Sequence, residues 1–72
     1  MKEIRDELAP GVILVTLRPI LIPWFCGYET IISFDSEKSW YILGRYNYEE
    51  DAVSGHRYFR KISIDDLMQV IN

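Results

Sequence analysis

Apolar residues cluster in one long run near the start of the chain, residues 11–27. Its first part, Val12–Arg18, is β-branched and apolar at successive positions, which predicts a strand buried on both faces. Pro19 and Pro23 then bracket three aliphatic residues, and two prolines so close together exclude a central strand or a helix interior. We therefore expect an edge or crossing segment there.

This apolar run does not predict a membrane span. Arg18 lies near its middle, and a spanning helix needs about 20 mostly apolar residues without a central charge. Residues 2–8 are net acidic, unlike the basic leader of a secretory signal. Ile4 and Leu8 share the spacing of one helix face, so residues 2–8 predict one or two helical turns that end at Pro10. We expect no membrane association and a cytoplasmic location.

Alternating patterns further along predict three more strands. Two of them, Tyr28–Phe34 and Trp40–Tyr48, are separated by residues 35–39, which have turn composition. The segment Glu49–Gly55 is acidic and ends in Ser-Gly, which indicates a loop, and His56–Ile62 then predicts the last strand. The predicted strands Trp40–Tyr48 and His56–Ile62 would form a hairpin.

The boundaries of the predicted strands indicate a pairing register that brings the large apolar side chains together. Opposite charges and apolar groups stabilise a sheet when they face each other across neighbouring strands. The expected pairs are Phe34 with Trp40, Ile32 with Ile42, Thr30 with Gly44, Glu29 with Arg45 and, in the last hairpin, Tyr46 with Tyr58.

The clearest local signal is a helix start near the C-terminus. Ser63 followed three residues later by Asp66 is a capping box in its Asp form. Apolar residues then recur at helical spacing, at Ile64, Leu67, Met68 and Ile71. Residues 1–72 are therefore expected to form a single small domain of the β-rich α+β class. Its antiparallel sheet of three to five strands would be strongly bent or closed as an SH3-like barrel, with a short C-terminal helix; a plain sheet with one helix is the alternative.

Composition limits the function classes. The chain is 49% hydrophobic, which excludes disorder, and its net charge of −3 argues against a dedicated nucleic-acid binder. A domain of this length buries only roughly 60% of its unfolded surface, so some apolar side chains are expected to remain outside the core.

The chemistry-bearing residues are few. Cys26 is the single cysteine, which precludes an internal disulfide and favours a reducing compartment. Its large apolar neighbours indicate an inert core thiol, although a reactive thiol paired with His56 is an alternative. One Cys and one His are too few for a zinc site, and Glu49–Asp51 lacks the spacing of a calcium loop. We expect no catalytic residue, no metal and no cofactor.

The surplus apolar side chains point instead to binding. We expect a non-enzymatic protein–protein interaction module, an inhibitor or accessory subunit of bacterial or phage origin, that binds another protein or a second copy of itself. Aromatic residues and arginine predominate at binding hot spots. The expected partner-binding residues are Tyr41, Leu43, Phe59, Arg57, Trp24 and Tyr48.

Nucleic-acid binding is the alternative. The predicted last hairpin would place basic and aromatic side chains on one face, as in platforms for single strands. Its basic residues are Arg45, Arg57, Arg60 and Lys61. A salt-dependent titration distinguishes this alternative from protein binding.

Two short segments resemble a known family. Residues 39–44, Ser-Trp-Tyr-Ile-Leu-Gly, followed by residues 58–62, Tyr-Phe-Arg-Lys-Ile, are similar to the last hairpin of WYL domains. The resemblance covers about a third of the chain and implies an SH3-like, ligand-sensing barrel. It assigns no functional residue.

Overall fold

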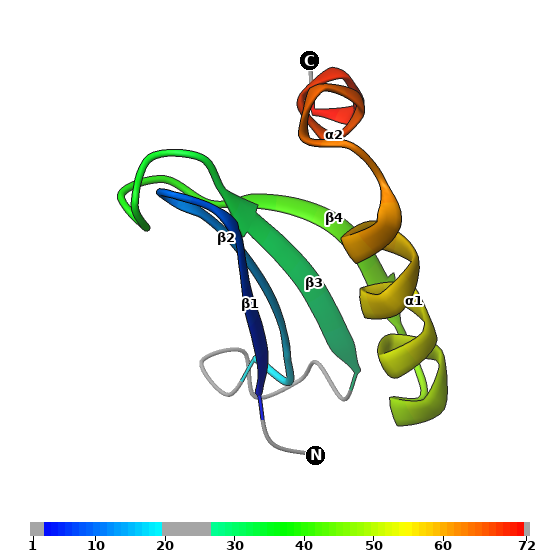
Figure 1. Ribbon diagram of the computed structural model, residues 1–72. Coiled ribbons are helices and arrows are strands. Elements are labelled where there is room, and N and C mark those ends of the chain that lie inside the picture. The colour runs from blue at the N-terminus through cyan, green and yellow to red at the C-terminus, as the bar shows by residue number, and fades with distance from the viewer. Residues whose placement is uncertain (1–2, 20–26, 72) are drawn as a thin grey trace.

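The computed structural model describes residues 3–19 and 27–71 of the chain. An antiparallel sheet with strands in sequence order precedes two helices (Figure 1). The elements are β1 (Ile4–Ala9), β2 (Val12–Leu17), β3 (Tyr28–Ser33), β4 (Tyr41–Tyr46), α1 (Glu49–Lys61) and α2 (Ile64–Val70). This arrangement confirms the predicted α+β class, with a small antiparallel sheet and a C-terminal helix.

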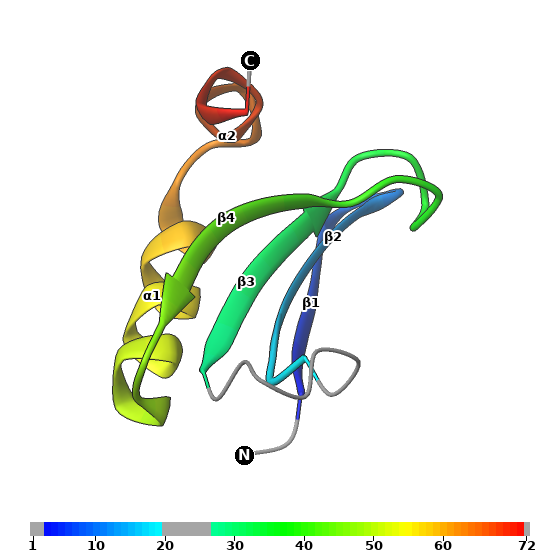
Figure 2. The same ribbon diagram turned by 180° about the vertical axis from the view of Figure 1, so that it is seen from behind.

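The sheet is curved and open. Its order is β1-β2-β3-β4, so β1 and β4 are the edge strands and do not pair with each other within the described residues. Helix α1 lies against one face, where it contacts all four strands (Figures 1 and 2). Of the predicted alternatives, the structure has the strongly bent sheet without closure into a barrel.

The hydrophobic core lies between the sheet and the helices. Leu14 of β2, Ile32 of β3 and Leu67 of α2 are fully buried and pack together. Leu67 is the only fully buried residue of α2, and together with the partly buried Ile64 it attaches this helix to the core. On the other face of β2, Ile13 and Val15 are also buried, which confirms the predicted two-sided burial of this strand.

The tips of the two hairpins are joined. Gly11, between β1 and β2, has a φ of 79°, which glycine adopts readily. Its carbonyl accepts a hydrogen bond from the N–H of Ser36 at 3.0 Å, in the turn between β3 and β4. An exposed ion pair of 2.6 Å, from Arg5 to Glu37, spans the same gap.

The expected helical turns at residues 2–8 are wrong. Within the described residues, Ile4–Ala9 forms β1, in which Asp6 pairs with Leu14 of β2. The spacing of two apolar residues is a weak preference, whereas hairpin pairing satisfies the backbone of the whole segment and brings Leu8 against the core. The strand ends at the predicted position, next to Pro10.

The register of β3 and β4 follows the prediction at one end only. Glu29 faces Arg45 and Thr30 faces Gly44, as expected. A β-bulge next to Thr30 then shifts the pairing by one residue. The remaining expected pairs are wrong: instead Ile31 faces Ile42, and Ile32 faces Tyr41.

The expected acidic loop and fourth strand are also wrong. Glu49–Lys61 forms one continuous helix, so no pairing of Tyr46 with Tyr58 exists. Three acidic residues occupy its first turn and two basic residues its last, the distribution that favours a helix dipole. The prediction for α2 is confirmed: the Ser63 hydroxyl accepts a hydrogen bond from the N–H of Asp66 at 3.2 Å.

A close approach between β4 and α1 explains the glycine in the middle of the helix. A methyl group at Gly55 would overlap the ring and hydroxyl of Tyr46. The same side chain lies close to Gly44, where an added Cβ would be 2.8 Å from the Tyr46 hydroxyl. Tyr46 therefore occupies space that only two glycines leave open.

We predict that Gly55→Ala destabilises the protein, although alanine is the better helix former. The displaced Tyr46 ring should cost about 1–3 kcal/mol of unfolding free energy, against a gain of about 1 kcal/mol or less from helix propensity. Urea denaturation measures the difference. Ser54→Ala, at the exposed neighbouring position, is the matched control and should be neutral or slightly stabilising. A more stable Gly55→Ala protein would contradict the packing described.

We also predict that the turn after β3 contributes to folding stability and that this contribution is lost in acid. The backbone N–H of Ser39 and the hydroxyl of Ser33, each 2.8 Å from Asp35, lower the pKa of the Asp35 carboxyl below its ordinary value of 3.8. A carboxyl whose pKa is lower in the folded than in the unfolded state stabilises the protein at pH values above its unfolded-state pKa. This stabilisation is lost as the pH falls through the folded-state pKa.

Asp35→Asn should therefore reduce stability at neutral pH and flatten its decline below pH about 4. Unfolding midpoints measured across this range provide the test. Glu7→Gln, an exposed substitution on β1, is the control. Parallel profiles for wild type and Asp35→Asn would contradict the prediction.

Candidate functional site

A chain of polar side chains crosses the interior between the sheet and α1. It contains five residues from five elements: Asp6 of β1, Thr16 of β2, Thr30 of β3, Tyr46 of β4 and His56 of α1. Both threonines are fully buried, and His56 is 2% exposed. We call these five residues the His56 network. Polar groups at this depth are costly unless each is hydrogen-bonded, and here each has a partner.

The distances within the His56 network are short throughout. The Tyr46 hydroxyl lies 3.0 Å from Thr30 Oγ1, which lies 2.6 Å from Thr16 Oγ1. Thr16 Oγ1 lies 2.7 Å from Nδ1 of His56. On the other side of the imidazole, Nε2 lies 2.7 Å from Oδ2 of Asp6. His56 thus bridges a hydroxyl chain and a carboxylate.

The hydrogen-bonding capacity of each group determines which group donates in each bond. An ionised Asp6 only accepts, so Nε2 of His56 carries a proton and donates it. If Nδ1 carries no proton, it can only accept, so the Thr16 hydroxyl donates to it. Thr30 then donates to Thr16, and Tyr46 donates to Thr30. All donors therefore point from Tyr46 towards Asp6.

The order carboxylate, imidazole, hydroxyl also occurs at nucleophilic active sites. Here, however, Thr16 is fully buried, so a substrate has no access to its hydroxyl. The arrangement joins α1 to all four strands. The His56 network therefore joins structural elements and does not present an exposed nucleophile.

Sequence reasoning missed the role of His56. Its position was expected at a loop–strand junction, but the residue faces the sheet from α1, one turn after Ala52. Ala52 and His56 are the only buried residues of this helix. Their i, i+4 spacing, continued by the partly buried Phe59, is the signal that indicates a helix face. The expected pairing of His56 with Cys26 concerns a residue outside the described ranges.

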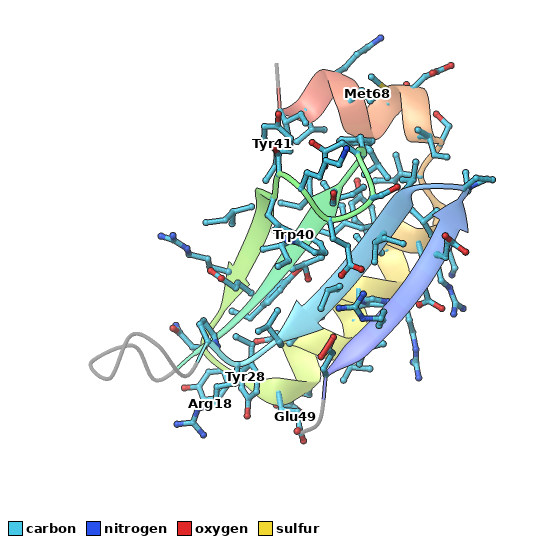
Figure 3. The ribbon with its side chains drawn as sticks, turned by 90° about the vertical axis from the view of Figure 1, so that its left-hand side faces the viewer. Arg18, Tyr28, Trp40, Tyr41, Glu49 and Met68 are labelled. Carbon is cyan, nitrogen blue, oxygen red and sulfur yellow. The ribbon has the colours of Figure 1, made fainter. Side chains whose placement is uncertain are left out.

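Three consecutive large apolar residues are exposed where β4 begins. Trp40 is 37% exposed, Tyr41 44% and Ile42 49%. We call these three residues the β4 apolar surface. Figure 3 shows Tyr41 at the same end of the molecule as Met68 of α2, which is also exposed. The surface lies on an edge strand whose outer side has no neighbouring strand within the described residues.

The expected partner-binding residues do not form one face. Tyr41 and Tyr48 are exposed, but Tyr41 is the first residue of β4 and Tyr48 follows the end of that strand, so they lie at opposite ends of it. Leu43 and Phe59 are partly buried and pack against the hydrophobic core. Arg57 is exposed on α1. The sixth residue, Trp24, lies outside the described residues.

The expected basic hairpin face is wrong, because three of its four basic residues lie on α1. Arg45, on β4, is 3.6 Å from Glu29, as the cross-strand pairing predicted. Arg60 lies 3.8 Å from Asp6 of the His56 network. Arg57 and Lys61 are exposed one helical turn apart. The cations are thus divided between a strand and a helix.

The described part of the chain contains no group of three or more residues able to hold a metal ion. Among the described helices, none is long and apolar enough to cross a membrane.

Comparisons with protein-family models, with curated proteins and with solved structures gave no match. The resemblance to the last hairpin of WYL domains does not extend to the structure. Residues 58–61 of the second segment belong to α1, so the two segments do not form a hairpin.

We predict that Thr16→Val destabilises the protein although it preserves the side-chain volume. The substitution removes the hydroxyl that joins His56 to Thr30, and leaving buried polar groups unpaired costs about 1–3 kcal/mol. Thr16→Ser keeps the hydroxyl and loses a methyl group. Urea denaturation of both variants should show the greater loss for Thr16→Val. Packing alone predicts the opposite order, so that order would contradict a hydrogen-bonding role.

Proposed function

We propose that this chain is a non-enzymatic protein–protein interaction module that binds its partner through the β4 apolar surface. The observation that supports this proposal is the exposure of Trp40, Tyr41 and Ile42 at the start of an edge strand. Large apolar side chains that remain outside a core mark interaction sites when they lie together. Trp and Tyr are also enriched among residues that contribute most to binding.

The position of this surface supports a protein partner. Ile42 faces Ile31 and so lies on the opposite side of the sheet from Tyr41, which faces Ile32. A partner at this edge would contact side chains on both sides of β4. The partner-binding role of Tyr48 and Arg57 stays a prediction, as does an inhibitory or accessory role of bacterial or phage origin.

Nucleic-acid binding is a second candidate, and one observation favours it. Arg57 and Lys61 are exposed one turn apart on α1, and Tyr58 between them is 63% exposed. The first turn of the same helix carries three acidic residues, and the chain is net negative. Phosphate binding would have to overcome this charge. Protein binding is therefore the better supported proposal.

We predict that Ile42→Ser weakens partner binding without unfolding the domain, because Ile42 is about half exposed. The tagged chain is used to capture proteins from an extract of its native host, and the captured protein is then purified and titrated. Loss of an anchor residue should reduce affinity by about tenfold or more. Urea denaturation should show a nearly unchanged unfolding free energy.

Tyr58→Ser, which removes an exposed aromatic residue from α1, is the matched control and should retain full affinity. Equal weakening by both variants would contradict the assignment to β4. A titration with a single-stranded oligonucleotide at two salt concentrations completes the test. Steeply salt-dependent binding that requires Arg57 and Lys61 would replace the proposal with the nucleic-acid alternative.

A further inference from the structure

We propose that Asp6 and His56 form an acid-sensitive latch that holds α1 on the sheet, in which the charge of Asp6 decides whether the helix stays docked. The inference is independent of the proposed function. It rests on the position of the imidazole, which is 2% exposed, and on its contacts with β1 and β2.

The groups that face His56 come from every element around it. Asp6 of β1 is the only carboxylate in the His56 network, at 2.7 Å from Nε2. Arg60, one turn further along α1, lies 3.8 Å from the same carboxylate oxygen. From β2 and β3 the network contains only threonine hydroxyls, and from β4 the hydroxyl of Tyr46. One negative charge therefore faces two groups that carry or can acquire a positive charge.

The network can accept a proton on Nδ1 while Asp6 remains ionised. Nδ1 of His56 then donates to Thr16, which reverses its hydroxyl and donates to Thr30. Nε2 still donates to Asp6, now as an ion pair. Every buried polar group keeps a partner in this second arrangement. Protonation of the imidazole alone therefore does not release the helix.

Loss of the charge on Asp6 has a different effect. A protonated His56 would then be a buried cation with no counter-ion in the network, because the carboxyl that it shares with Arg60 would be uncharged. An uncompensated buried charge is strongly destabilising. Apart from His56, only Ala52 of α1 is fully buried, and Phe59 contacts the core as a partly buried side chain, so the cost at His56 acts on a helix with few other buried contacts. Undocking of α1 exposes the imidazole to water and relieves this cost.

Asp6→Asn tests the latch, because it removes the charge while an amide oxygen can still accept from Nε2. NMR follows the ring protons of His56 for its protonation, and amide exchange at Ala52 in α1 and Leu14 in β2 for docking. In the wild type, α1 should stay docked while the ring becomes protonated and be released only on further acidification. In Asp6→Asn, release should coincide with ring protonation.

At a pH where the ring is mostly protonated, the docked population of Asp6→Asn should be at least about tenfold lower than that of the wild type. Glu7→Gln, the neighbouring position on β1, is the control and should match the wild type. Simultaneous release in wild type and Asp6→Asn would overturn the proposal, as would a variant that keeps α1 docked around a protonated ring.

A second variant keeps the test decisive if Asp6→Asn does not fold. Arg60→Gln removes the neighbouring cation at an exposed position, with a side chain 54% exposed. Because the Asp6 carboxylate loses a neighbouring cation that favours its charged form, the latch predicts that this variant releases α1 at a higher pH than the wild type. An unchanged or lower release pH would contradict a mechanism based on the charges around Asp6.

Discussion

The hydrogen bonds of His56 to Thr16 and Asp6 are the interactions on which the rest of the structure depends. Helix α1 has a polar sequence and buries only Ala52 and His56. The partly buried Phe59 adds a contact with the hydrophobic core, so α1 is held on the sheet by limited apolar packing together with a polar contact in the interior. The two hydrogen bonds of His56 join α1 to β1 and β2, so the two halves of the chain are stabilised together.

The close packing of β4 against α1 follows from the same arrangement. Tyr46 reaches Thr30 only by lying across Gly55, and the side chain also passes close to Gly44. A polar network at the centre thus requires two glycines at its end, one of them inside a helix. Apolar residues outside this interior, above all at the start of β4, are exposed and form the surface on which the proposed binding function rests.

Local sequence signals predicted some elements correctly and failed at others for identifiable reasons. The strand at Val12–Leu17 and the cap at Ser63 are strong signals, because β-branched runs and capping residues act within a few positions. Residues 4–9 failed because pairing with β2 outweighs a weak helical spacing. Helix α1 failed because Ser54 and Gly55 have turn composition, while the glycine is explained only by the distant ring of Tyr46.

The sequence by itself determined the α+β class, the turn at residues 35–39, the final helix and the surplus of apolar side chains, since these depend on composition and on residues close together in the chain. Only the tertiary structure decided the state of residues 49–61, the bulge that turns Ile42 away from Ile32, and the burial of His56. Asp6 and His56 are 50 positions apart, and no local pattern records which distant hydroxyls and carboxylates meet in the interior.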